Sequence, residues 1–256
     1  MNKYADLKRK LADKEPVIMA NIMLTTSPLM IRAFENADCV LLDKEHGVYG
    51  TEELIPLTMQ CRAMGLPSII RVEDAVYHLI AKALDLGADG IMLPRTERPE
   101  QLRIAVDAMR FAPEGRTGFG GWGILRDGES IEQFNRGRIL LVQIESPKGL
   151  ASMEAMLEGF GDAIDGFIIG PNDYSIMMGV PRQLDHPVML EEYRKFYDIC
   201  RKHGKSCGVF DPDAKHAMRD LGMGASIFWI SDDFSCMKAG FEALADEVRS
   251  FGVNER

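Results

Sequence analysis

Eight short runs of apolar, β-branched residues recur along the chain, and most are followed by a segment with helical spacing. The runs cover residues 17–23, 39–42, 68–72, 90–93, 139–144, 166–169, 207–210 and 226–230. They are apolar almost throughout, rather than at every second position, which is typical of parallel strands buried on both faces. The alternation of such strands with helices predicts an α/β fold.

The segments between the runs carry apolar residues three and four positions apart, as amphipathic helices do. These predicted helices cover residues 51–64, 74–86, 99–110, 148–159, 187–203, 213–221 and 234–251. Eight repeating units in 256 residues favour a closed (β/α)8 barrel, or TIM barrel, over a doubly wound sheet. A doubly wound sheet would also need a Gly-rich dinucleotide turn after its first strand, where this chain has LTTSP. We therefore expect one barrel domain over residues 1–256, whose last helix closes its own barrel or packs on a neighbouring subunit.

Charge and cysteine usage narrow the class of partner. The net charge is −9 and no long basic run occurs, so we expect neither nucleic acid nor a membrane surface as a partner. The five cysteines are odd in number and lack CxxC spacing, which favours reduced thiols over a disulfide framework or a thiolate zinc site. The charged first residues and the absence of a long apolar run add to the expectation of a cytoplasmic protein that acts on a small molecule.

Polar side chains follow most of the predicted strands, at the end of a barrel where active sites form. They are Asp43, Lys44, Glu45 and His46 after strand two, Arg71 and Arg95 at strands three and four, Gln143 and Glu145 at strand five, Asn172 and Asp173 after strand six, and Asp211 and Asp232 at strands seven and eight. This regular placement predicts that they converge on one mouth of the barrel.

Glu145 and Asp173 end adjacent predicted strands, so their carboxylates are expected to face the same mouth. Two carboxylates repel each other unless one is protonated or a cation lies between them. An oxygen-rich site for Mg2+ or Mn2+ is therefore one interpretation, and Gly170 would allow a ligand close to the backbone. The alternative is that each carboxylate caps a helix or pairs with a surface lysine.

His46 and Arg71 are candidates for catalysis and substrate binding. His46 lies three residues after Asp43, so a carboxylate-oriented imidazole suited to acid–base chemistry is one hypothesis, and a structural histidine is the other. Arg71 ends an apolar strand, where a charge is costly unless it faces a ligand or a carboxylate. Arg71 would then recognise a carboxylate or an oxyanion, or form a structural ion pair in the barrel mouth.

Six segments of the chain resemble the class II pyruvate aldolase family, which is also called the HpcH/HpaI aldolase family. The family is named for 4-hydroxy-2-oxoheptane-1,7-dioate aldolase and 2-dehydro-3-deoxyglucarate aldolase. The segments are LLDKEHG at 41–47, LGADGIMLPR at 86–95, RFAPEGRTGFG at 110–120, VQIESPKGL at 142–150, DGFIIGPNDYS at 165–175 and DPDAKHAMRDLG at 211–222. The resemblance covers nearly the whole chain, and VQIES with GPNDYS is its most specific part.

The resemblance implies a TIM barrel of the phosphoenolpyruvate/pyruvate-domain type. It also implies reversible cleavage of a 4-hydroxy-2-oxo acid to pyruvate and an aldehyde, with a divalent ion such as Mg2+, Mn2+ or Co2+. Glu145 and Asp173 match the family's two protein metal ligands, and His46 with Asp43 matches its acid–base dyad. Arg71 matches the arginine that binds the 2-oxo group and steadies the negative charge of the reaction.

Further matches concern substrate binding and assembly. Gln143 matches a polar residue near metal and substrate, and the backbone at Asn172 and Asp173 matches the part that holds the pyruvate carboxylate. Asp85 matches a carboxylate that reaches the dyad of a neighbouring subunit. The family is commonly hexameric, as a trimer of dimers that exchange the last helix, so the resemblance implies a homo-oligomer.

Two segments depart from the family pattern. Strand one reads MANIMLTTSP without the glycine of many relatives, and the long irregular stretch 112–138 contains the unusual GFGGWGILRDG. Both departures concern the aldehyde side of the pocket, so the acceptor aldehyde stays open. Two other functions also stay open: an acyl-CoA lyase of the citrate-lyase type, for which the acidic chain shows no obvious basic patch, and a non-catalytic metabolite-binding barrel.

Overall fold

Eight parallel strands pair in chain order and close into a barrel in the computed structural model, which describes residues 3–120 and 124–253. The strands are β1 (Val17–Ile22), β2 (Cys39–Asp43), β3 (Ser68–Arg71), β4 (Gly90–Leu93), β5 (Ile139–Ile144), β6 (Gly166–Ile169), β7 (Ser206–Asp211) and β8 (Ile227–Ile230). The barrel closes where β1 pairs with β8, from Val17 opposite Ile227 to Ala20 opposite Ile230. The predicted (β/α)8 barrel is confirmed, and each predicted run differs from its strand by at most one residue at either end.

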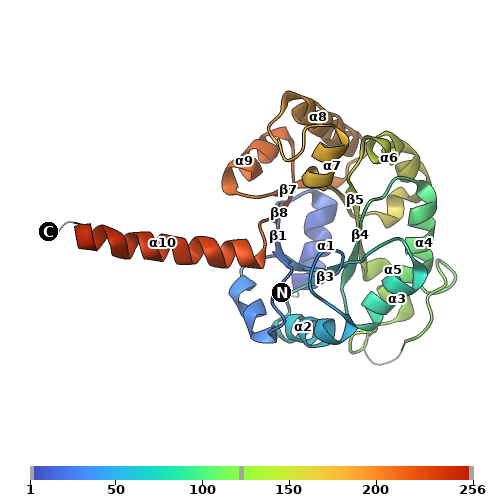
Figure 1. Cartoon of the computed structure of the whole chain (residues 1–256). Helices are drawn as coiled ribbons and strands as arrows, with labels where there is room; N and C mark the ends of the chain where they lie inside the picture. The colour runs from blue at the N-terminus through green and yellow to red at the C-terminus, as the bar shows by residue number, and fades with distance from the viewer. Residues whose placement is uncertain (1–2, 121–123, 254–256) are drawn as a thin grey trace.

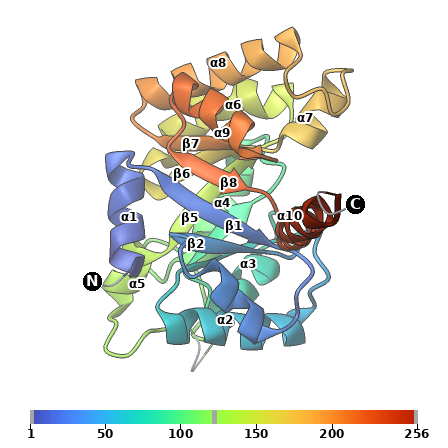
Figure 2. The same cartoon turned by 90° about the vertical axis from the view of Figure 1, so that its left-hand side faces the viewer.

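Most of the helices surround the barrel on its outside, while α1 covers one end of it and α10 projects away from it (Figures 1 and 2). The helices are α1 (Lys3–Asp13), η1 (Pro28–Phe34), α2 (Thr51–Met64), α3 (Tyr77–Asp85), α4 (Pro99–Met109), α5 (Ile131–Gly137), α6 (Pro147–Phe160), η2 (Gly161–Ala163), α7 (Pro171–Met177), α8 (Pro187–Lys202), α9 (Ala214–Met223) and α10 (Asp233–Val253). The apolar pattern did not predict α1, α5 or α7, which are too short or too polar to show it. Helix α5 lies within the stretch 112–138 that was expected to be irregular, and residues 121–123 of that stretch lie outside the described residues.

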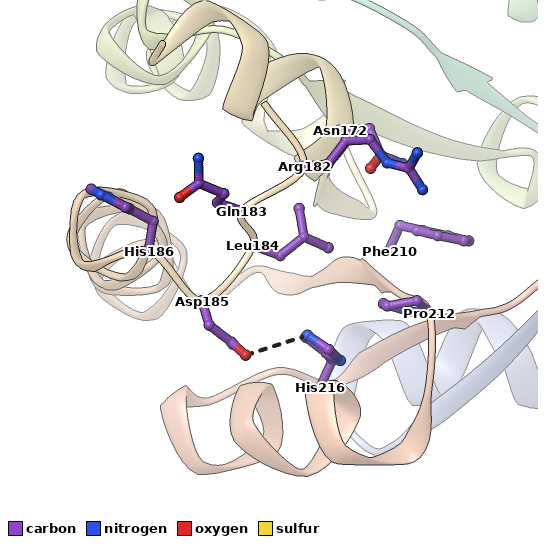
Figure 3. Close-up of a pocket in the computed structure, with 9 residues that line it drawn as sticks. All are labelled: Asn172, Arg182, Gln183, Leu184, Asp185, His186, Phe210, Pro212 and His216. Carbon is purple, nitrogen blue, oxygen red and sulfur yellow. Dashed lines mark ion pairs between the residues drawn. The ribbon is translucent and has the colours of Figure 1, made fainter. Parts of the chain in front are cut away.

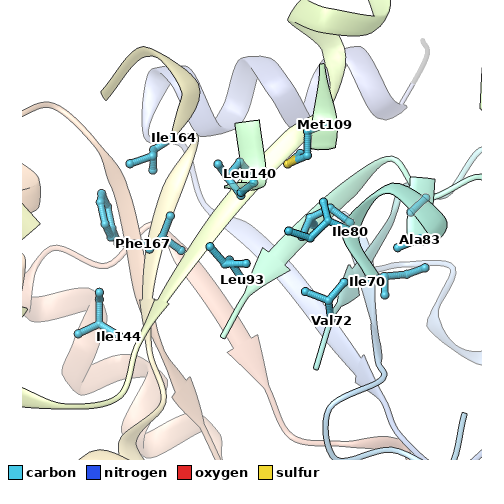
Figure 4. Packing of buried hydrophobic residues seen from close by; sticks show 14 of the residues in the cluster. Ile70, Val72, Ile80, Ala83, Leu93, Met109, Leu140, Ile144, Ile164 and Phe167 are labelled. Carbon is cyan, nitrogen blue, oxygen red and sulfur yellow. The ribbon is translucent and has the colours of Figure 1, made fainter. Parts of the chain in front are cut away.

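Side chains alternate along each strand between the barrel interior and the surrounding helices, which gives two apolar clusters. Leu41, Ile69 and Leu141 point inward and pack with Leu7 and Leu11 of α1, which covers one end of the barrel. The second cluster lies between strands and helices. Figure 4 shows strand residues such as Ile70, Leu93 and Phe167 together with Ile80 of α3 and Met109 of α4.

Helix α10 projects away from the barrel instead of packing on it (Figure 1). Its apolar side chains are exposed: the exposed fraction is 72% for Phe241, 64% for Leu244 and 69% for Val248. Of the two alternatives for the last helix, closure of its own barrel is wrong, because this apolar stripe has no barrel beneath it. None of the helices within residues 3–120 and 124–253 is long and apolar enough to cross a membrane.

Candidate active site

Most of the polar residues predicted at the strand ends meet at the carboxyl end of the barrel, whereas Lys44 pairs with Glu73 instead. A pocket of about 250 Å3 lies there, lined by Asn21, Met23, His46, Arg71, Gln143, Glu145, Gly170, Pro171, Asn172, Asp173, Phe210, Trp229 and Asp232. The strand alternation explains this placement, because Arg71 and Gln143 each follow an inward-pointing apolar residue by two positions. Ile69 and Leu141 thus belong to an apolar layer inside the barrel, and Arg71 and Gln143 lie in the next layer toward the carboxyl end of the strands.

Arg71 is 4% exposed and holds the centre of a buried polar network. Its Nε atom donates to Asp43 Oδ1 at 2.8 Å, and its Nη2 atom donates to Asp43 Oδ2. Its Nη1 atom donates to Gln143 Oε1 at 3.3 Å, and the guanidinium carbon lies 5.1 Å from the ring centre of Trp229. The two-point contact with Asp43 fixes the plane of the guanidinium group, which then presents a rigid positive charge at the pocket.

Asp43 does not contact the imidazole of His46, so the predicted dyad is not formed in this structure. Both carboxylate oxygens of Asp43 face Arg71, and Oδ1 also accepts hydrogen bonds from the backbone N–H groups of Glu45 (3.1 Å) and His46 (3.2 Å). The side chain of His46 is 55% exposed and lines the pocket. Asp43 therefore orients Arg71 and the turn after β2, and the carboxylate that lies near the imidazole belongs to another group.

That group is Glu45, which the sequence pattern did not single out. Its side chain is buried, with Oε2 3.8 Å from His46 Nε2 and 3.4 Å from Arg71 Nη1, and with Oε1 3.1 Å from Arg95 Nε. Burial raises the pKa of Glu45, and the nearby positive charges of Arg71, His46 and Arg95 oppose that rise. The place of Glu45 in the polar DKEHG turn indicated that it could belong to the site, but spacing alone does not distinguish Glu45 from Asp43 as the carboxylate beside His46.

Glu145 is 5% exposed and is held at both oxygens. Oε1 accepts a hydrogen bond from Gln143 Nε2 at 2.7 Å, and Oε2 accepts one from the backbone N–H of Arg95 at 3.1 Å. Burial, and then the negative charges of Glu45 and Asp173, raise the pKa of Glu145 to about 7, although the charge of Arg71 opposes the rise. Burial is thus the main cause of the raised pKa, and two neighbouring carboxylates add to it.

Gly170 makes room for this carboxylate. A Cβ atom at position 170 would lie 2.3 Å from Glu145 Oε1 and 2.7 Å from Gln143 Nε2, which is closer than real Cβ contacts. Gly170 also begins the turn into α7, whose first residues are Pro171, Asn172 and Asp173. The group that approaches Gly170 is Glu145 itself, and the approach of a ligand to this backbone stays a prediction.

Glu145 and Asp173 fit a hard divalent cation. Asp173 lies in the first turn of α7, is exposed to the pocket side, and is near enough to raise the pKa of Glu145. Oriented carboxylate oxygens in excess of nearby positive charge are the donors that Mg2+ and Mn2+ prefer. Within the described ranges no set of three or more His, Cys, Asp or Glu side chains is arranged to hold a metal ion.

Asp85 lies away from this pocket. It is the last residue of α3, and helices of a (β/α)8 barrel run opposite to the strands, so it lies near the amino end of the barrel. Its carboxylate packs against Gly120, where a Cβ atom would lie 1.9 Å from Oδ1, and burial raises its pKa. Asp85 does not join His46 or Asp43 within one chain.

Asn21 and Trp229 were missed as site residues. Both line the pocket, and neither Asn21 Oδ1 nor Trp229 Nε1 has a hydrogen-bond partner among the described residues. A buried polar atom without a partner costs free energy, so these two unpaired atoms mark the inner wall of the pocket as a place where the polar groups are incompletely satisfied. A polar asparagine within the apolar run MANIM was the signal that could have revealed Asn21.

A closed (β/α)8 barrel with carboxylates, an arginine and a histidine gathered at its carboxyl end is the architecture of a TIM-barrel enzyme. The family model described as HpcH/HpaI aldolase/citrate lyase matches residues 23–235, and the chain belongs to this family. The chain is thus an aldolase, a carbon–carbon lyase.

Individual relatives agree with this assignment. The chain is 29% identical over 232 residues to a 5-keto-4-deoxy-D-glucarate aldolase of Salmonella arizonae, with 88% of each chain covered. It is 25% identical to the crystal structure of an HpcH/HpaI aldolase from Desulfitobacterium hafniense, with a TM-score of 0.87 and coverage of 95% of this chain and 96% of that one. An HpcH/HpaI aldolase/citrate lyase family protein from Burkholderia cenocepacia is also 25% identical, with a TM-score of 0.86 and coverage of 97% and 100%.

Proposed function

We propose that the chain is a class II pyruvate aldolase, which uses a divalent metal ion to cleave a 4-hydroxy-2-oxo acid reversibly into pyruvate and an aldehyde. The observation that carries the proposal is the buried Glu145, whose pKa is raised by burial and by Glu45 and Asp173 in front of the rigid Arg71. The similarity to 5-keto-4-deoxy-D-glucarate aldolases supports an acid of this class as the substrate.

Glu145 and Asp173 would hold Mg2+, Mn2+ or Co2+. When bound, the ion supplies Lewis-acid polarisation of the 2-oxo group of the substrate. Gln143 keeps Glu145 in its orientation through the 2.7 Å hydrogen bond, and its own Oε1 is held by Arg71. The backbone at Asn172 and Asp173 would receive the carboxylate of the pyruvate part.

Arg71 would face the 2-oxo oxygen, where negative charge develops as the C3–C4 bond breaks. Its two-point contact with Asp43 fixes the guanidinium before the reaction, so little reorganisation is needed as the charge appears. The half-exposed imidazole of His46 would accept the proton of the 4-hydroxyl group and return a proton to C3 of the departing pyruvate. Glu45 lies beside His46 and would stabilise its protonated form.

The exposed α10 supports an assembly of several copies. Phe241, Leu244 and Val248 form an apolar stripe that a second chain would cover if the last helices were exchanged. We propose a hexamer built as a trimer of such dimers, in which Asp85 reaches the His46 side of a neighbouring subunit. The one-domain organisation over residues 1–256 and the cytoplasmic location remain predictions from the sequence.

The test is pyruvate release from a 4-hydroxy-2-oxo acid with added Mg2+ or Mn2+, followed by coupled reduction of the pyruvate. We expect turnover that EDTA abolishes and that added metal restores, and the variant Glu145→Ala should lose it. Turnover that survives both EDTA and Glu145→Ala would overturn the proposal. Lys215→Gln, an exposed change outside the barrel mouth, serves as the control and should keep wild-type turnover.

A further inference from the structure

The active-site pocket is bounded by different elements on its two sides. On one side lies Phe210 of β7, which also lines a cavity of about 610 Å3 between the α7–α8 loop and the start of α9 (Figure 3). On the other side lie Met23, just after β1, and Asp232, just before α10. The segment that follows β1, residues 23–27, therefore contributes to the pocket wall and is called here the β1 loop.

Asp233 holds the β1 loop by its backbone. The carboxylate accepts hydrogen bonds from three consecutive N–H groups: Oδ1 from Met23 at 3.2 Å, and Oδ2 from Leu24 at 3.0 Å and from Thr25 at 2.7 Å. Successive N–H groups that point to one place form a concave anion site, and bonds to a charged acceptor are stronger than neutral ones. Asp233 is 8% exposed, so water competes little for these bonds.

The sheet does not supply acceptors for these three N–H groups. Strand β1 pairs with β2 only as far as Ile22 opposite Leu42, and with β8 only as far as Ala20 opposite Ile230. In the described part of the chain none of the three N–H groups donates to a backbone carbonyl. Leaving partly buried N–H groups without an acceptor costs free energy, so the Asp233 carboxylate replaces the strand that the β1 loop lacks.

Capping of the last helix does not account for the bonds of Asp233. It is Asp232 that caps α10, because its carboxylate accepts hydrogen bonds from the N–H and from Oγ of Ser235, both at 2.8 Å. Asp233 accepts one hydrogen bond from the helix, from the N–H of Phe234 at 3.1 Å. The bonds from Asp233 to the β1 loop are thus additional to the start of α10.

The carbonyl groups of the β1 loop contact the turn that carries His46. The Met23 carbonyl accepts a hydrogen bond from the N–H of Val48 at 3.0 Å, and the Thr25 carbonyl accepts one from the hydroxyl of Tyr49 at 2.9 Å. The β1 loop therefore lies between the first residue of α10 and the turn that presents the imidazole to the pocket.

We propose that Asp233 is a positioning residue of the aldolase reaction, which fixes the β1 loop and, through it, the pocket wall at Met23 and the turn of His46. The inference rests on the proposed function, in which the imidazole of His46 moves the proton. Asp233 is not among the described residues that line the pocket, so it acts through these neighbours and not on the substrate. The start of α10 thus serves the site, although the rest of the helix projects away from the barrel (Figure 1).

The test replaces Asp233 by asparagine, which keeps the shape of the side chain but turns one accepting oxygen into an NH2 donor. We expect amide hydrogen exchange at residues 23–25 to become about 10-fold faster or more, and kcat to fall about 10-fold well below the melting temperature. The affinity for Mn2+, measured by calorimetry, should stay unchanged, because Glu145 and Asp173 follow strands that do not pair with β1.

Asp213→Asn is the matched control. Asp213 caps α9 by accepting a hydrogen bond from the N–H of His216 at 3.0 Å, and asparagine caps a helix about as well as aspartate. This variant should change neither the exchange at residues 23–25 nor kcat. A residue that only stabilises the fold would lower the melting temperature and leave kcat of the folded protein unchanged.

Wild-type exchange at residues 23–25 in Asp233→Asn would overturn the inference, and so would a wild-type kcat in spite of faster exchange. Faster exchange throughout the barrel together with weaker Mn2+ binding would refute it as well, because the effect would then be a general loosening of the fold. If the wild type does not cleave a 4-hydroxy-2-oxo acid, the proposed function fails, and the exchange measurement alone decides whether Asp233 holds the β1 loop. Should Asp233→Asn not fold, Asp233→Glu, which keeps the charge on a longer side chain, is compared in the same way.

Discussion

The contact between Gly170 and Glu145 leads to a prediction whose size follows from the structure. In Gly170→Ala the new Cβ would lie 2.3 Å from Glu145 Oε1 and 2.7 Å from Gln143 Nε2, so the carboxylate must move and its bonds to Gln143 and Arg95 must lengthen. The backbone itself accepts alanine, since φ at Gly170 is −87°. The cost is therefore one of overpacking, about 1–3 kcal/mol, or a fall in melting temperature of roughly 2–12 °C for a chain of this size.

A double-mutant cycle checks this reasoning. Glu145→Ala removes two of the three atoms that the new methyl group would meet, Oε1 and Cγ of Glu145, and frees the Gln143 amide to move. Gly170→Ala should therefore cost less in that background than in wild type, by denaturant unfolding of the metal-free protein. Gly159→Ala is the matched control, because a Cβ there meets nothing within 4 Å and alanine favours the helix. Equal costs of Gly170→Ala in both backgrounds would refute the argument that Glu145 is the reason for the glycine.

Three further predictions concern charge and assembly. The pKa of Glu145 is raised to about 7 from an ordinary value of 4.5, so its contribution to the stability of the metal-free protein is complete below about pH 4.5 and is lost as the pH rises through 7. Glu145→Gln should make the free energy of unfolding less dependent on pH over this range. The affinity of the wild type for Mn2+, measured by calorimetry, should rise between pH 5.5 and 7.5, and a pH-independent affinity would contradict Glu145 as a metal ligand. Arg71→Lys replaces a two-point contact with Asp43 by a single one. We expect kcat to fall about 100-fold and the free energy of unfolding by about 2–4 kcal/mol, and a wild-type kcat would show that the two parallel guanidinium donors are not needed. Phe241→Asp with Leu244→Asp should give a smaller species in sedimentation velocity, and an unchanged mass would exclude α10 from the interface.

The strands and the general place of the site were predictable because burial imposes a pattern on sequence. The run at 139–144 is apolar since both faces of β5 are covered, and Gln143 and Glu145 interrupt the apolar pattern only where β5 reaches the mouth of the barrel. The same alternation places Arg71 above Ile69. These are local properties of a strand, so they can be read from neighbouring residues in the chain.

The choice of partners was not predictable in this way. Asp43 is close in sequence to His46, yet its two oxygens are taken by Arg71, which lies 28 residues away and opposite it in the β2–β3 register. Glu45 was expected at the barrel mouth but not as the neighbour of His46, because a turn residue can point in several directions and its place there depends on Arg71 and Arg95. The hydrogen bond that Glu145 receives from Arg95 comes from a backbone N–H, and a backbone donor leaves no mark on residue identity.

The closure of the barrel between β1 and β8 has a consequence for folding. The pocket takes Asn21 from the first strand and Trp229 and Asp232 from the last strand and the turn that follows it, so its two sides are separated by most of the chain. A piece of the chain that lacks either β1 or β8 cannot contain the whole pocket, and a ligand can stabilise only the state in which these two strands have met. Bound substrate or metal would then slow the separation of β1 from β8 more than it slows local unfolding elsewhere in the barrel. Resistance to proteolysis at that seam would report on occupancy of the pocket.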